Sequence, residues 1–463
     1  MKKKIGVFID HDLFVRNFLN NKIFSSLHKL YEVIYFFPEE KNRPGDRRRI
    51  NKKILDKIKV KKKIIVNVDF KRNIFVKYLF RISSLFFSRY KKDKDKEQFI
   101  KFHENAINSR TVFAILRLIS SYPIYYLTVY LFKKLILGKN IHLEKIIKKF
   151  QIDLILSPTT WGGYFDMDLI DIGKKFEIPT IFLMNSWDNT NFSGMPHENP
   201  NRYLVWGKKS KNYANEFKKI PLQNLDIIGS AQFSIKKQKK IEYKKLINLK
   251  KKDNFIVYAG SNMGIDEGYH LKLIDEHIIK KKRPYKIIYR PHPWKVKAKN
   301  EKHIKAYNFK NVILDPFSKK NYDNIFFKNK NFNKTIANSN SHESYLIIES
   351  SVGLFGPVGT LCLEACWNKK PVATYLPSDR NEIRHLFKTL VDAKHIQDFI
   401  KDLKIPLCKN SSQIVNKIDY IYKRKNSKKY LSYIKKKSKN FLDYDLNYKE
   451  ILLKNIRKVL SQK

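Results

Sequence analysis

The sequence predicts an α/β protein made of two doubly wound domains, and three observations lead to this prediction. The chain has 463 residues, more than one hydrophobic core usually holds, so two domains are expected. Short apolar runs alternate with helical patterns in both halves, as in parallel sheets whose strands are joined by helices. Each half also carries a polar segment directly after an apolar run, where open parallel sheets place their ligands.

The N-terminal half opens with this alternation of strands and helices. Ile5 to Ile9 is a continuous apolar run, which is typical of a parallel strand buried on both faces. The apolar spacing from Phe14 to Leu30 predicts a helix. Tyr31 to Phe37 and Lys62 to Val68 are expected to be the next two strands. Because the basic N-terminus has a short apolar run that ends at Asp10, we predict a first strand there rather than a signal peptide.

Residues 70–150 interrupt the alternation and are predicted to be a helical insertion. The longest uncharged stretch, Leu118 to Phe132, has 15 residues and contains Pro123, whereas a membrane-spanning helix needs ~20. We therefore reject a transmembrane helix. The tyrosines and nearby cations of this stretch could contact a membrane surface, but buried helices of the N-terminal domain are the favoured interpretation.

The alternation resumes after the insertion and continues through the second half. Further strands are expected at 152–156, 180–184, 203–206, 226–233, 255–259, 285–289, 312–314, 352–355 and 371–375, with helices at 168–176, 210–217, 267–280 and from 360. Residues 317–343, rich in Lys, Asn and Phe, are expected to be a mobile loop or an insertion. The predicted domains are 1–234 and 235–430, followed by basic helices at 431–463, with a lysine-rich connector at the boundary.

A candidate anion-binding site lies in the second half. The strand that begins at Val352 leads into a loop with Gly356 and Gly359, and then into a helix that opens near Thr360. Backbone N–H groups and the helix dipole at such a point suit a phosphate. The segment Arg290-Pro-His-Pro293 adds a cation and an imidazole after another strand, and its two prolines would fix the loop. We predict that Arg290 and His292 bind the same ligand, together with Ser261, which follows a third strand.

The charge of the chain does not by itself identify a partner. The formal net charge is +52, and the sequence contains 78 Lys but only 17 Arg. Nucleic-acid-binding proteins favour Arg for bidentate contacts, and these lysines are spread along the chain rather than gathered in one stripe. Nucleic-acid binding is therefore not expected. We expect instead a basic surface that attracts anionic sugar donors or anionic lipids.

Neither a metal nor a disulfide is predicted. The three cysteines, Cys362, Cys366 and Cys408, have no zinc spacing and form no disulfide framework, which fits a reduced cytosolic compartment. The one Asp-x-Asp segment, Asp166 to Asp168, opens a predicted helix, where acidic residues are favoured by the helix dipole. We interpret it as structural.

An ordered set of motifs resembles those of a known group of enzymes. The motifs are Trp187-Asp-Asn189, Leu204-Val-Trp-Gly207, Ile228-Gly-Ser-Ala-Gln-Phe233, Arg290-Pro-His-Pro293 and Gly359-Thr-Leu-Cys-Leu-Glu-Ala365. They resemble a group of bacterial surface-polysaccharide transferases of the GT-B fold. That group is similar to the CDP-glycerol glycerophosphotransferases and to UDP-N-acetylglucosamine 2-epimerase. The resemblance covers most of 1–40 and 150–380.

The resemblance implies two Rossmann-like domains that face each other across a cleft, with the donor bound by the C-terminal domain without a metal or cofactor. Arg290, His292 and the N–H groups around Gly359 and Thr360 would stabilise the departing phosphate. Glu364 matches the residue that takes the ribose hydroxyls.

The acceptor side is expected in the N-terminal domain, which must supply a base. Asp10 and His11, at the end of the first strand, are the first candidates, and Asp188 competes with them. His11 could equally be a loop histidine bonded to the backbone. Arg16 and Asn17 could bind an anionic acceptor group or lie on a helix surface. Trp187 and Asn189 belong to the polar segment after the 180–184 strand and are expected beside the acceptor.

The function implied is transfer of a glycosyl or glycerophosphoryl group from a nucleotide-activated donor to a surface-polysaccharide or lipid-linked acceptor. It would take place at the cytoplasmic face of the membrane. A non-hydrolysing epimerase of the same fold and a scaffold without turnover remain alternatives. Asp266-Glu-Gly268, His292-Pro293 and Ser350-Ser351 also resemble sialyltransferase motifs. We interpret this match as chance because the first two lie within one half, although a CMP-sugar donor stays open.

Overall fold

The chain folds into two compact units. In the computed structural model, unit 1 comprises Met1–Ile235 and Leu442–Lys463, and unit 2 comprises Lys236–Lys334 and Ser339–Phe441. The structure describes residues 2–39, 50, 52–66, 78–79, 81–86, 88, 97, 100–101, 103–104, 107, 109–135, 140–161, 165–190, 196, 198–234, 242–299, 301–327, 341–384, 387–388 and 390–462.

Unit 1 is built on a parallel sheet. Its described strands are ordered β3-β2-β1-β4-β5-β6-β7, and every neighbouring pair is parallel. The strands are β1 (Lys4–Phe8), β2 (Glu32–Pro38), β3 (Lys63–Val66), β4 (Leu154–Thr159), β5 (Thr180–Met184), β6 (Arg202–Val205) and β7 (Leu225–Ile227). The order reverses direction between β1 and β4, so the sheet is doubly wound, as the apolar runs predict.

The predicted helix from Phe14 to Leu30 is wrong in detail, because the chain breaks into four short pieces. These are α1 (Asp12–Phe14), the π-helix η1 (Val15–Leu19), the 3-10 helix η2 (Ile23–Ser26) and α2 (Leu27–Leu30). The break falls at Lys22, which has a left-handed backbone with φ of 51°. Just before it, the Asn21 amide donates to the Asn17 carbonyl oxygen at 3.0 Å. A side chain that bonds the local backbone competes with helix continuation.

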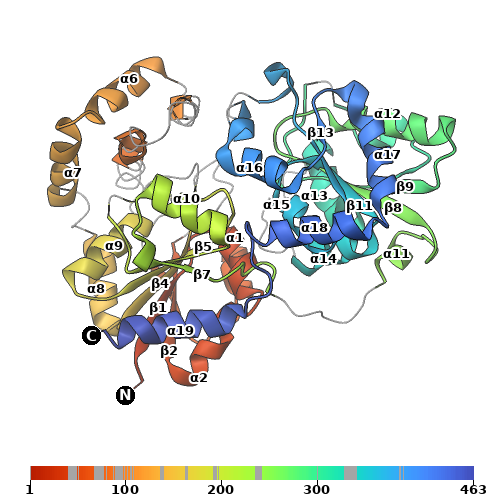
Figure 1. Ribbon diagram of the computed structural model, residues 1–463. Helices are drawn as coiled ribbons and strands as arrows, with labels where there is room; N and C mark the ends of the chain where they lie inside the picture. Colours follow the sequence, from red (N-terminus) through yellow and green to blue (C-terminus); the bar gives the residue numbers. More distant parts are fainter. Residues whose placement is uncertain are drawn as a thin grey trace. The chain divides into compact units, whose positions relative to one another are not determined.

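Helices complete unit 1, and the last of them comes from the C-terminus. They are α3 (Lys52–Lys57), α6 (Arg110–Ile119), α7 (Ile124–Leu135), α8 (Ile141–Phe150), α9 (Asp166–Lys175), α10 (Lys208–Lys218), the 3-10 turn η5 (Leu222–Asn224) and α19 (Tyr448–Leu460). Leu452 and Ile456 of α19 are fully buried in the same core as Ile5 and Val7 of β1. Figure 1 shows α19, in blue, beside the red N-terminal strands.

Unit 2 repeats the doubly wound pattern. Its described strands are ordered β10-β9-β8-β11-β12-β13, again with parallel pairs. The strands are β8 (Asn254–Ala259), β9 (Tyr285–Arg290), β10 (Val312–Leu314), β11 (Gly353–Pro357), β12 (Val372–Tyr375) and β13 (Leu407–Cys408). The reversal of order lies between β8 and β11. This switch point is where such sheets bind ligands.

Helices surround the sheet of unit 2 (Figure 1). They are α11 (Tyr243–Leu246), α12 (Glu267–Lys280), α13 (Pro316–Phe327), α14 (Ser341–Ser350), α15 (Thr360–Trp367), α16 (Lys394–Leu403), α17 (Ile414–Arg424) and α18 (Lys428–Ser438), with 3-10 turns η6 (Ile304–Tyr307), η7 (Arg380–Glu382), η9 (Leu390–Asp392) and η10 (Ser411–Gln413).

Two expectations for the second half need correction. The stretch from 317, expected to be a loop, begins with α13, because Pro316 suits the first helical position and Tyr322 is buried in the core. Residues 328–340 of that predicted loop lie outside the described part. The basic helices of 431–463 do not form a unit of their own. α18 packs on α15 and α16 in unit 2, whereas α19 belongs to unit 1.

Candidate functional site

The carboxyl edge of the unit 2 sheet brings together three of the predicted donor-binding segments. Ser261 follows β8, Arg290 and His292 follow β9, and Gly359 and Thr360 follow β11. These three strands are neighbours in the sheet, with β8 in the middle. The predicted residues therefore lie at the switch point of one sheet, although Ser261 and Thr360 are 99 positions apart in the sequence (360 − 261).

The three loops pack backbone against backbone. The Gly260 N–H donates to the Arg290 carbonyl oxygen at 2.8 Å, and a Cβ on Gly260 would lie only 3.0 Å from the His292 nitrogen. Gly356 of β11 has φ of 153°, and a Cβ there would lie 2.2 Å from the Ala259 carbonyl oxygen. Glycine is needed at both positions because no side chain fits between the loops. The edge is thus a closely packed surface of main-chain groups.

The loop after β8 is held by a buried glutamate. The Ser261 N–H donates to Glu267 Oε1 at 2.6 Å, and the Met263 N–H donates to Ser261 Oγ at 3.3 Å. Glu267 is the first residue of α12, and Asp266 caps this helix by accepting from the Tyr269 N–H at 2.9 Å. Glu267 therefore fixes the loop. Ser261 contributes two hydrogen bonds to it, one from its backbone N–H and one to its hydroxyl oxygen.

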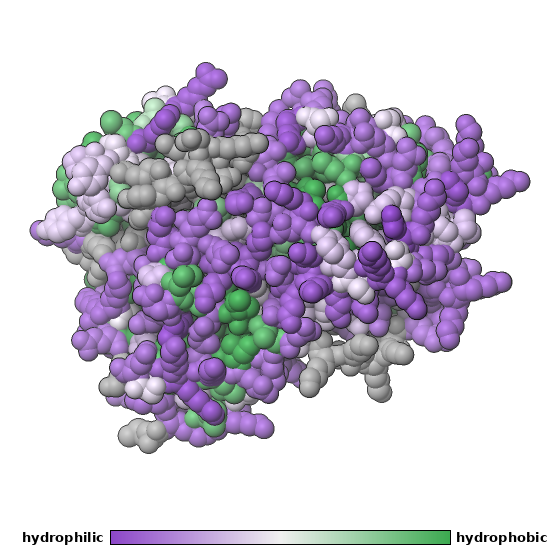
Figure 2. Space-filling view, in the orientation of Figure 1, coloured by the Kyte–Doolittle hydropathy of each residue, from purple (hydrophilic) through white to green (hydrophobic). Residues whose placement is uncertain are grey.

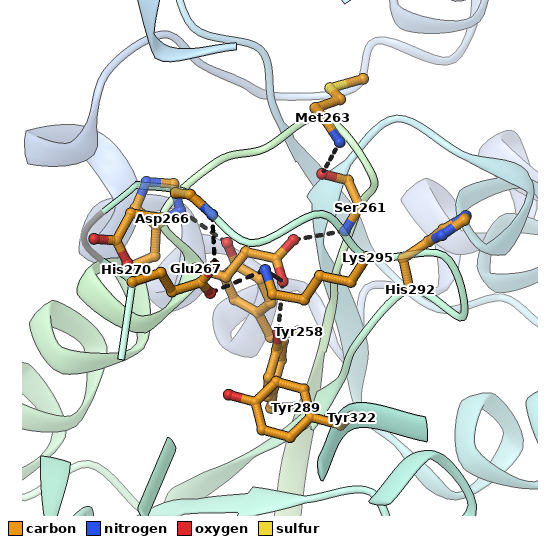
Figure 3. A network of polar contacts seen from close by, with 12 residues as sticks. Tyr258, Ser261, Met263, Asp266, Glu267, His270, Tyr289, His292, Lys295 and Tyr322 are labelled. Atoms are coloured by element: carbon orange, nitrogen blue, oxygen red, sulfur yellow. Dashed lines mark hydrogen bonds and ion pairs between the residues drawn. The ribbon is translucent and has the colours of Figure 1, made fainter. Parts of the chain in front are cut away.

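Glu267 is part of a buried charge network (Figure 3). Lys295 Nζ lies 2.8 Å from Glu267 Oε2 and 2.9 Å from Glu301 Oε1, and the side chains of all three residues are essentially inaccessible to solvent. The Tyr289 hydroxyl also donates to Glu267 Oε2, and Figure 3 shows Tyr289, Lys295 and the Ser261 backbone meeting at this carboxylate. Three ionised groups in the core are tolerated only when each is paired and hydrogen-bonded.

The network has consequences for protonation. Burial acts to lower the pKa of Lys295, but the carboxylates of Glu267 and Glu301 outweigh it and raise that pKa above its ordinary value. Burial raises the pKa of Glu301, against the lowering effect of Lys295. Beside them, burial, reinforced by the Lys295 charge, lowers the pKa of His270 to about 3. A neutral His270 then shares a 2.8 Å hydrogen bond with the Tyr258 hydroxyl.

Arg290 is engaged within unit 2. Its guanidinium forms an ion pair with Asp315, whose side chain is fully buried, and donates to Ser344 Oγ at 3.2 Å. Asp315 also accepts from the hydroxyls of Tyr243 at 2.9 Å and Ser318 at 2.8 Å. We predicted that Arg290 binds a ligand. The structure gives this side chain a structural partner, so Arg290 anchors the loop that carries His292.

His292 is half-buried and is oriented by its own loop. Its Nδ1 accepts from the Trp294 N–H at 3.0 Å. In a neutral ring this contact places the proton on Nε2, which can then donate. Figure 3 shows the imidazole pointing away from the Glu267–Lys295 network. The ring is therefore directed by the Trp294 backbone and is separate from the buried charges beneath it.

The start of α15 has the geometry of an anion site. Gly359 is its N-cap residue, with an extended backbone and no side-chain cap, and Thr360 is the first helical residue. A Cβ on Gly359 would meet nothing nearer than the Pro357 carbonyl oxygen at 4.0 Å, so there is open space beside it. N–H groups at the first turn of a helix favour an anion.

Glu364 lies in the middle of α15, and its side chain is fully buried. In this arrangement the carboxylate is shielded from solvent, so contact with a ribose requires a local movement of the groups around it. Cys362 and Cys366 lie on the same helix and are also buried, and burial raises the pKa of both thiols. They pack as small apolar groups.

At the end of β1 in unit 1, His11 is the N-cap of α1. Its Nδ1 accepts from the Leu13 N–H at 3.0 Å and also lies 2.9 Å from Asp12 Oδ1. One ring nitrogen cannot accept and donate at once, so the two contacts are alternatives. If Nδ1 donates to Asp12, the lone pair of the ring lies on Nε2, as in orienter–base pairs. Asp10 is buried next to them.

Asparagines connect the strand ends of unit 1. The Asn17 amide donates to Asn185 Oδ1 at 2.9 Å, which joins the segment after β1 to the segment after β5. The Asn21 amide donates to the Ala231 carbonyl oxygen at 3.0 Å. Arg16 Nε donates to Asn17 Oδ1 at 2.8 Å. Asn17 is thus buried between two segments and does not lie on a helix surface, the alternative we had left open.

The segment after β5 forms a tight turn. Asn189 is buried, and its Oδ1 accepts from the Ser186 N–H at 2.7 Å, while its amide lies 3.4 Å from Asp188 Oδ1. Trp187 is 6% exposed, so it is almost entirely buried. Asp188 is half-buried. Asp188 is therefore the most accessible of these three residues. Asn189 stabilises the turn that carries it.

The Asp166–Asp168 segment has structural partners. Thr159 Oγ1 donates to Asp166 Oδ2 at 2.8 Å, and the Asn140 amide donates to Asp168 Oδ2 at 2.9 Å. Both carboxylates lie in the first turn of α9 and are buried. Within the described ranges, no cluster of three or more His, Cys, Asp or Glu side chains has the arrangement of a metal site.

Sequence reasoning missed the residues that support the site. Lys295 is one of 78 lysines, and nothing in its local sequence distinguishes it. Glu267 belongs to the segment Asp266-Glu-Gly268, but the sequence of that segment does not show that its side chain is buried beneath a loop. Asp12 follows His11 directly, and a vicinal acid–imidazole pair at a strand end is a signal that could have been used.

The two parallel sheets and their strand order define the class of fold. The chain has the two-domain α/β fold shared by GT-B glycosyltransferases and UDP-N-acetylglucosamine 2-epimerases, as the motifs predicted. Its sequence matches no protein-family profile and is similar to no curated protein sequence.

Similarity to solved structures supports this assignment of the fold. A Listeria monocytogenes protein assigned as a UDP-N-acetylglucosamine 2-epimerase aligns with a TM-score of 0.53 at 9% identity, over 100% of this chain and 98% of that chain. The glycosyltransferase SnogD from Streptomyces nogalater aligns with a TM-score of 0.51 at 7% identity, over 99% of this chain and 100% of that chain. At such low identity these similarities establish the fold alone.

Proposed function

We propose that this chain transfers a glycosyl or glycerophosphoryl group from a nucleotide-activated donor to a surface-polysaccharide or lipid-linked acceptor. One observation carries the proposal. In unit 2, the half-buried imidazole of His292 and the uncapped start of α15 follow β9 and β11, the two strands on either side of β8 at the switch point of a doubly wound sheet. This arrangement suits the phosphates of a nucleotide.

In the proposed reaction, the bond between the transferred group and the nucleotide phosphate oxygen breaks, and its electron pair stays on that oxygen. The N–H groups of Gly359 and Thr360 and a proton on His292 Nε2 stabilise the charge. The acceptor hydroxyl oxygen forms the new bond and loses its proton to a base. Because these groups can take the phosphate charge, we propose a reaction without a metal or cofactor.

We propose His11 of unit 1 as that base. Asp12, 2.9 Å from Nδ1, would hold the ring with its lone pair on Nε2 and would stabilise the imidazolium that forms. Asp188 is the alternative base, since its carboxylate is the accessible one in the turn after β5. Replacing each of the two residues separately decides between them.

A second candidate is a non-hydrolysing nucleotide-sugar epimerase. The fold similarity to the Listeria monocytogenes protein supports it. The two functions differ in one respect that can be measured. An epimerase converts its sugar nucleotide without an acceptor, whereas a transferase releases the nucleotide only when an acceptor is supplied.

The test has two stages. First, a thermal-shift screen of UDP-, CDP-, CMP- and GDP-linked donors should find one that stabilises the protein, by about 2.7 kcal/mol at 100 times its Kd. Second, nucleotide release is measured with that donor and candidate acceptors. We expect His292→Ala to lower the rate by about 10²-fold or more, and His11→Ala to lose transfer but keep donor binding.

The control is His142→Ala, which replaces an exposed histidine on α8 and should leave the rate unchanged. Full activity of His292→Ala in a folded protein contradicts the assignment of the donor site. A change of sugar configuration without acceptor establishes the epimerase instead. If no donor in the screen stabilises the protein, the nucleotide-donor proposal fails.

A further inference from the structure

Helices α6 and α7 expose an apolar face. The residues on it are Ile115, Leu118, Tyr122, Ile124, Tyr126, Leu127, Tyr130, Leu131 and Leu135, and all of them are exposed. Leu118 is 64% exposed and Tyr122 is 69% exposed. On α7, Leu127, Leu131 and Leu135 follow one another at intervals of four, so they form a strip along one side of the helix. Large apolar side chains gathered in this way mark an interaction surface.

This face is additional to the one that forms a core. Phe113, Leu116 and Tyr125 point the other way and pack with Ile82 and Phe86 in a separate hydrophobic cluster. The rings of Tyr125 and Phe86 stack with centroids 3.6 Å apart. The helix pair therefore already has a packed side, and the exposed strip is its second apolar side.

The charged residues within the helix pair itself all have one sign. Between 110 and 135 the sequence contains Arg110, Arg117, Lys133 and Lys134 but no Asp or Glu. Arg110, Arg117 and Lys134 are exposed. An apolar face with tyrosines and flanking cations suits the boundary between lipid headgroups and acyl chains, especially when the lipids are anionic. A second copy of the same face is disfavoured because it would bring like charges together.

The shape of the pair suits a membrane surface. None of the described helices is by itself long and apolar enough to cross a bilayer. α6 and the first part of α7, Ile124–Phe132, reach that length and apolarity only together, and they are bent by 95°. With a rise of ~1.5 Å per residue, the two helices are only about 15 and 18 Å long, against a hydrocarbon core of ~30 Å. Figure 2 shows green and pale atoms at the upper left, where Figure 1 places α6 and α7.

We propose that the α6–α7 face docks the protein on an anionic lipid surface, with its leucines and tyrosines inserted at headgroup depth and its cations against the phosphates. This inference is independent of the transfer reaction proposed above. It rests on the exposed strip and its charges, and binding can be measured without a donor or acceptor.

The experiment uses the full-length chain and sedimentation with vesicles of phosphatidylcholine, with or without about 30% phosphatidylglycerol. We expect binding to the anionic vesicles, weakened by salt. The double variant Leu118→Ser and Leu127→Ser should lower the partition coefficient by about tenfold or more, because two inserted leucines are removed. Both side chains are exposed, so folding, checked by circular dichroism, should be preserved.

The matched control is the double variant Leu222→Ser and Leu246→Ser. These leucines are also exposed, at 53% and 47%, but they lie outside the helix pair. Their replacement should leave vesicle binding unchanged. Equal binding by both double variants, or equal binding to neutral and anionic vesicles, overturns the proposal. So does the absence of vesicle binding together with a dimer, measured by light scattering, that the Leu118 and Leu127 changes abolish.

Discussion

Units 1 and 2 share a doubly wound parallel sheet, but they hold their carboxyl edges together by different means. In unit 1, neutral amides connect the segments, with Asn17 bonded to Asn185 and Asn21 to a backbone carbonyl. In unit 2, buried charges do so, through the Glu267–Lys295–Glu301 network and the pair of Arg290 with Asp315.

The difference concerns how firmly each edge is fixed. A neutral amide pair can lose one member at modest cost, whereas a buried charge that loses its partner is strongly destabilising. The charged network lies directly under the loops that we assign to the donor. We infer that unit 2 keeps its loops in one arrangement, and that the amide-linked edge of unit 1 tolerates more change.

The largest effect is expected for Lys295→Met. This change removes the cation between two buried carboxylates, and leaving them unpaired should lower the free energy of unfolding by about 3–5 kcal/mol. Urea denaturation measures the loss, and hydrogen exchange in β8 and β9 assigns it to unit 2. The matched control is Lys319→Met, which breaks an exposed pair with Asp323 and should cost less than about 1 kcal/mol. Similar losses in the two variants would show that the network has no special role.

A smaller effect is expected for Asn17→Ala in unit 1. It removes the buried hydrogen bond to Asn185 and the acceptor of the Arg16 Nε–H, which should together cost about 1–2 kcal/mol. The same urea denaturation measures it, with hydrogen exchange in β1 and β5 as the local readout. If this variant loses as much stability as Lys295→Met, the contrast between the two edges is wrong.

The smallest effect concerns His270 and pH. The unfolded chain binds a proton at this residue near its ordinary pKa of 6.5, whereas the folded chain does so only near 3. Falling pH within this window therefore favours the unfolded chain, and stability rises again as pH increases. Between pH 6.5 and 5.5 the contribution is about 1 kcal/mol. His270→Gln should remove that part of the pH dependence, and an unchanged slope would show that His270 is protonated in the folded protein.

Much of the fold follows from local patterns. The strands at 180–184 and 312–314 and the helix at 267–280 occur where the apolar spacing predicts them, because strands buried on both faces need continuous apolar runs. The helix at 14–30 was not predictable in detail, since its break depends on a side chain of Asn21 that bonds the backbone. The place of α19 in unit 1 was not predictable either, because an amphipathic pattern does not identify the core that it covers.

The site divides in the same way. Loops that follow strands could be recognised from the apolar runs, so the sequence predicted that Ser261, His292, Gly359 and Thr360 lie after strands, where the structure has them. Their binding of a donor stays a prediction. The residues that pair with these loops from distant parts of the chain could not be recognised. Asp315 forms an ion pair with Arg290. Lys295 forms an ion pair with Glu267, which in turn accepts a hydrogen bond from the Ser261 N–H. These contacts depend on which loops the sheet order brings together.

The central claim is that the carboxyl edge of β8, β9 and β11 binds the phosphates of a nucleotide. Hydrogen exchange of the full-length chain, with and without a saturating nucleoside diphosphate, tests it most directly. We expect slower exchange in residues 260–264, 290–294 and 359–362 and little change in the segment after β5 of unit 1. Protection confined to unit 1, or no change at any of these three loops while the nucleotide is bound, would contradict the claim.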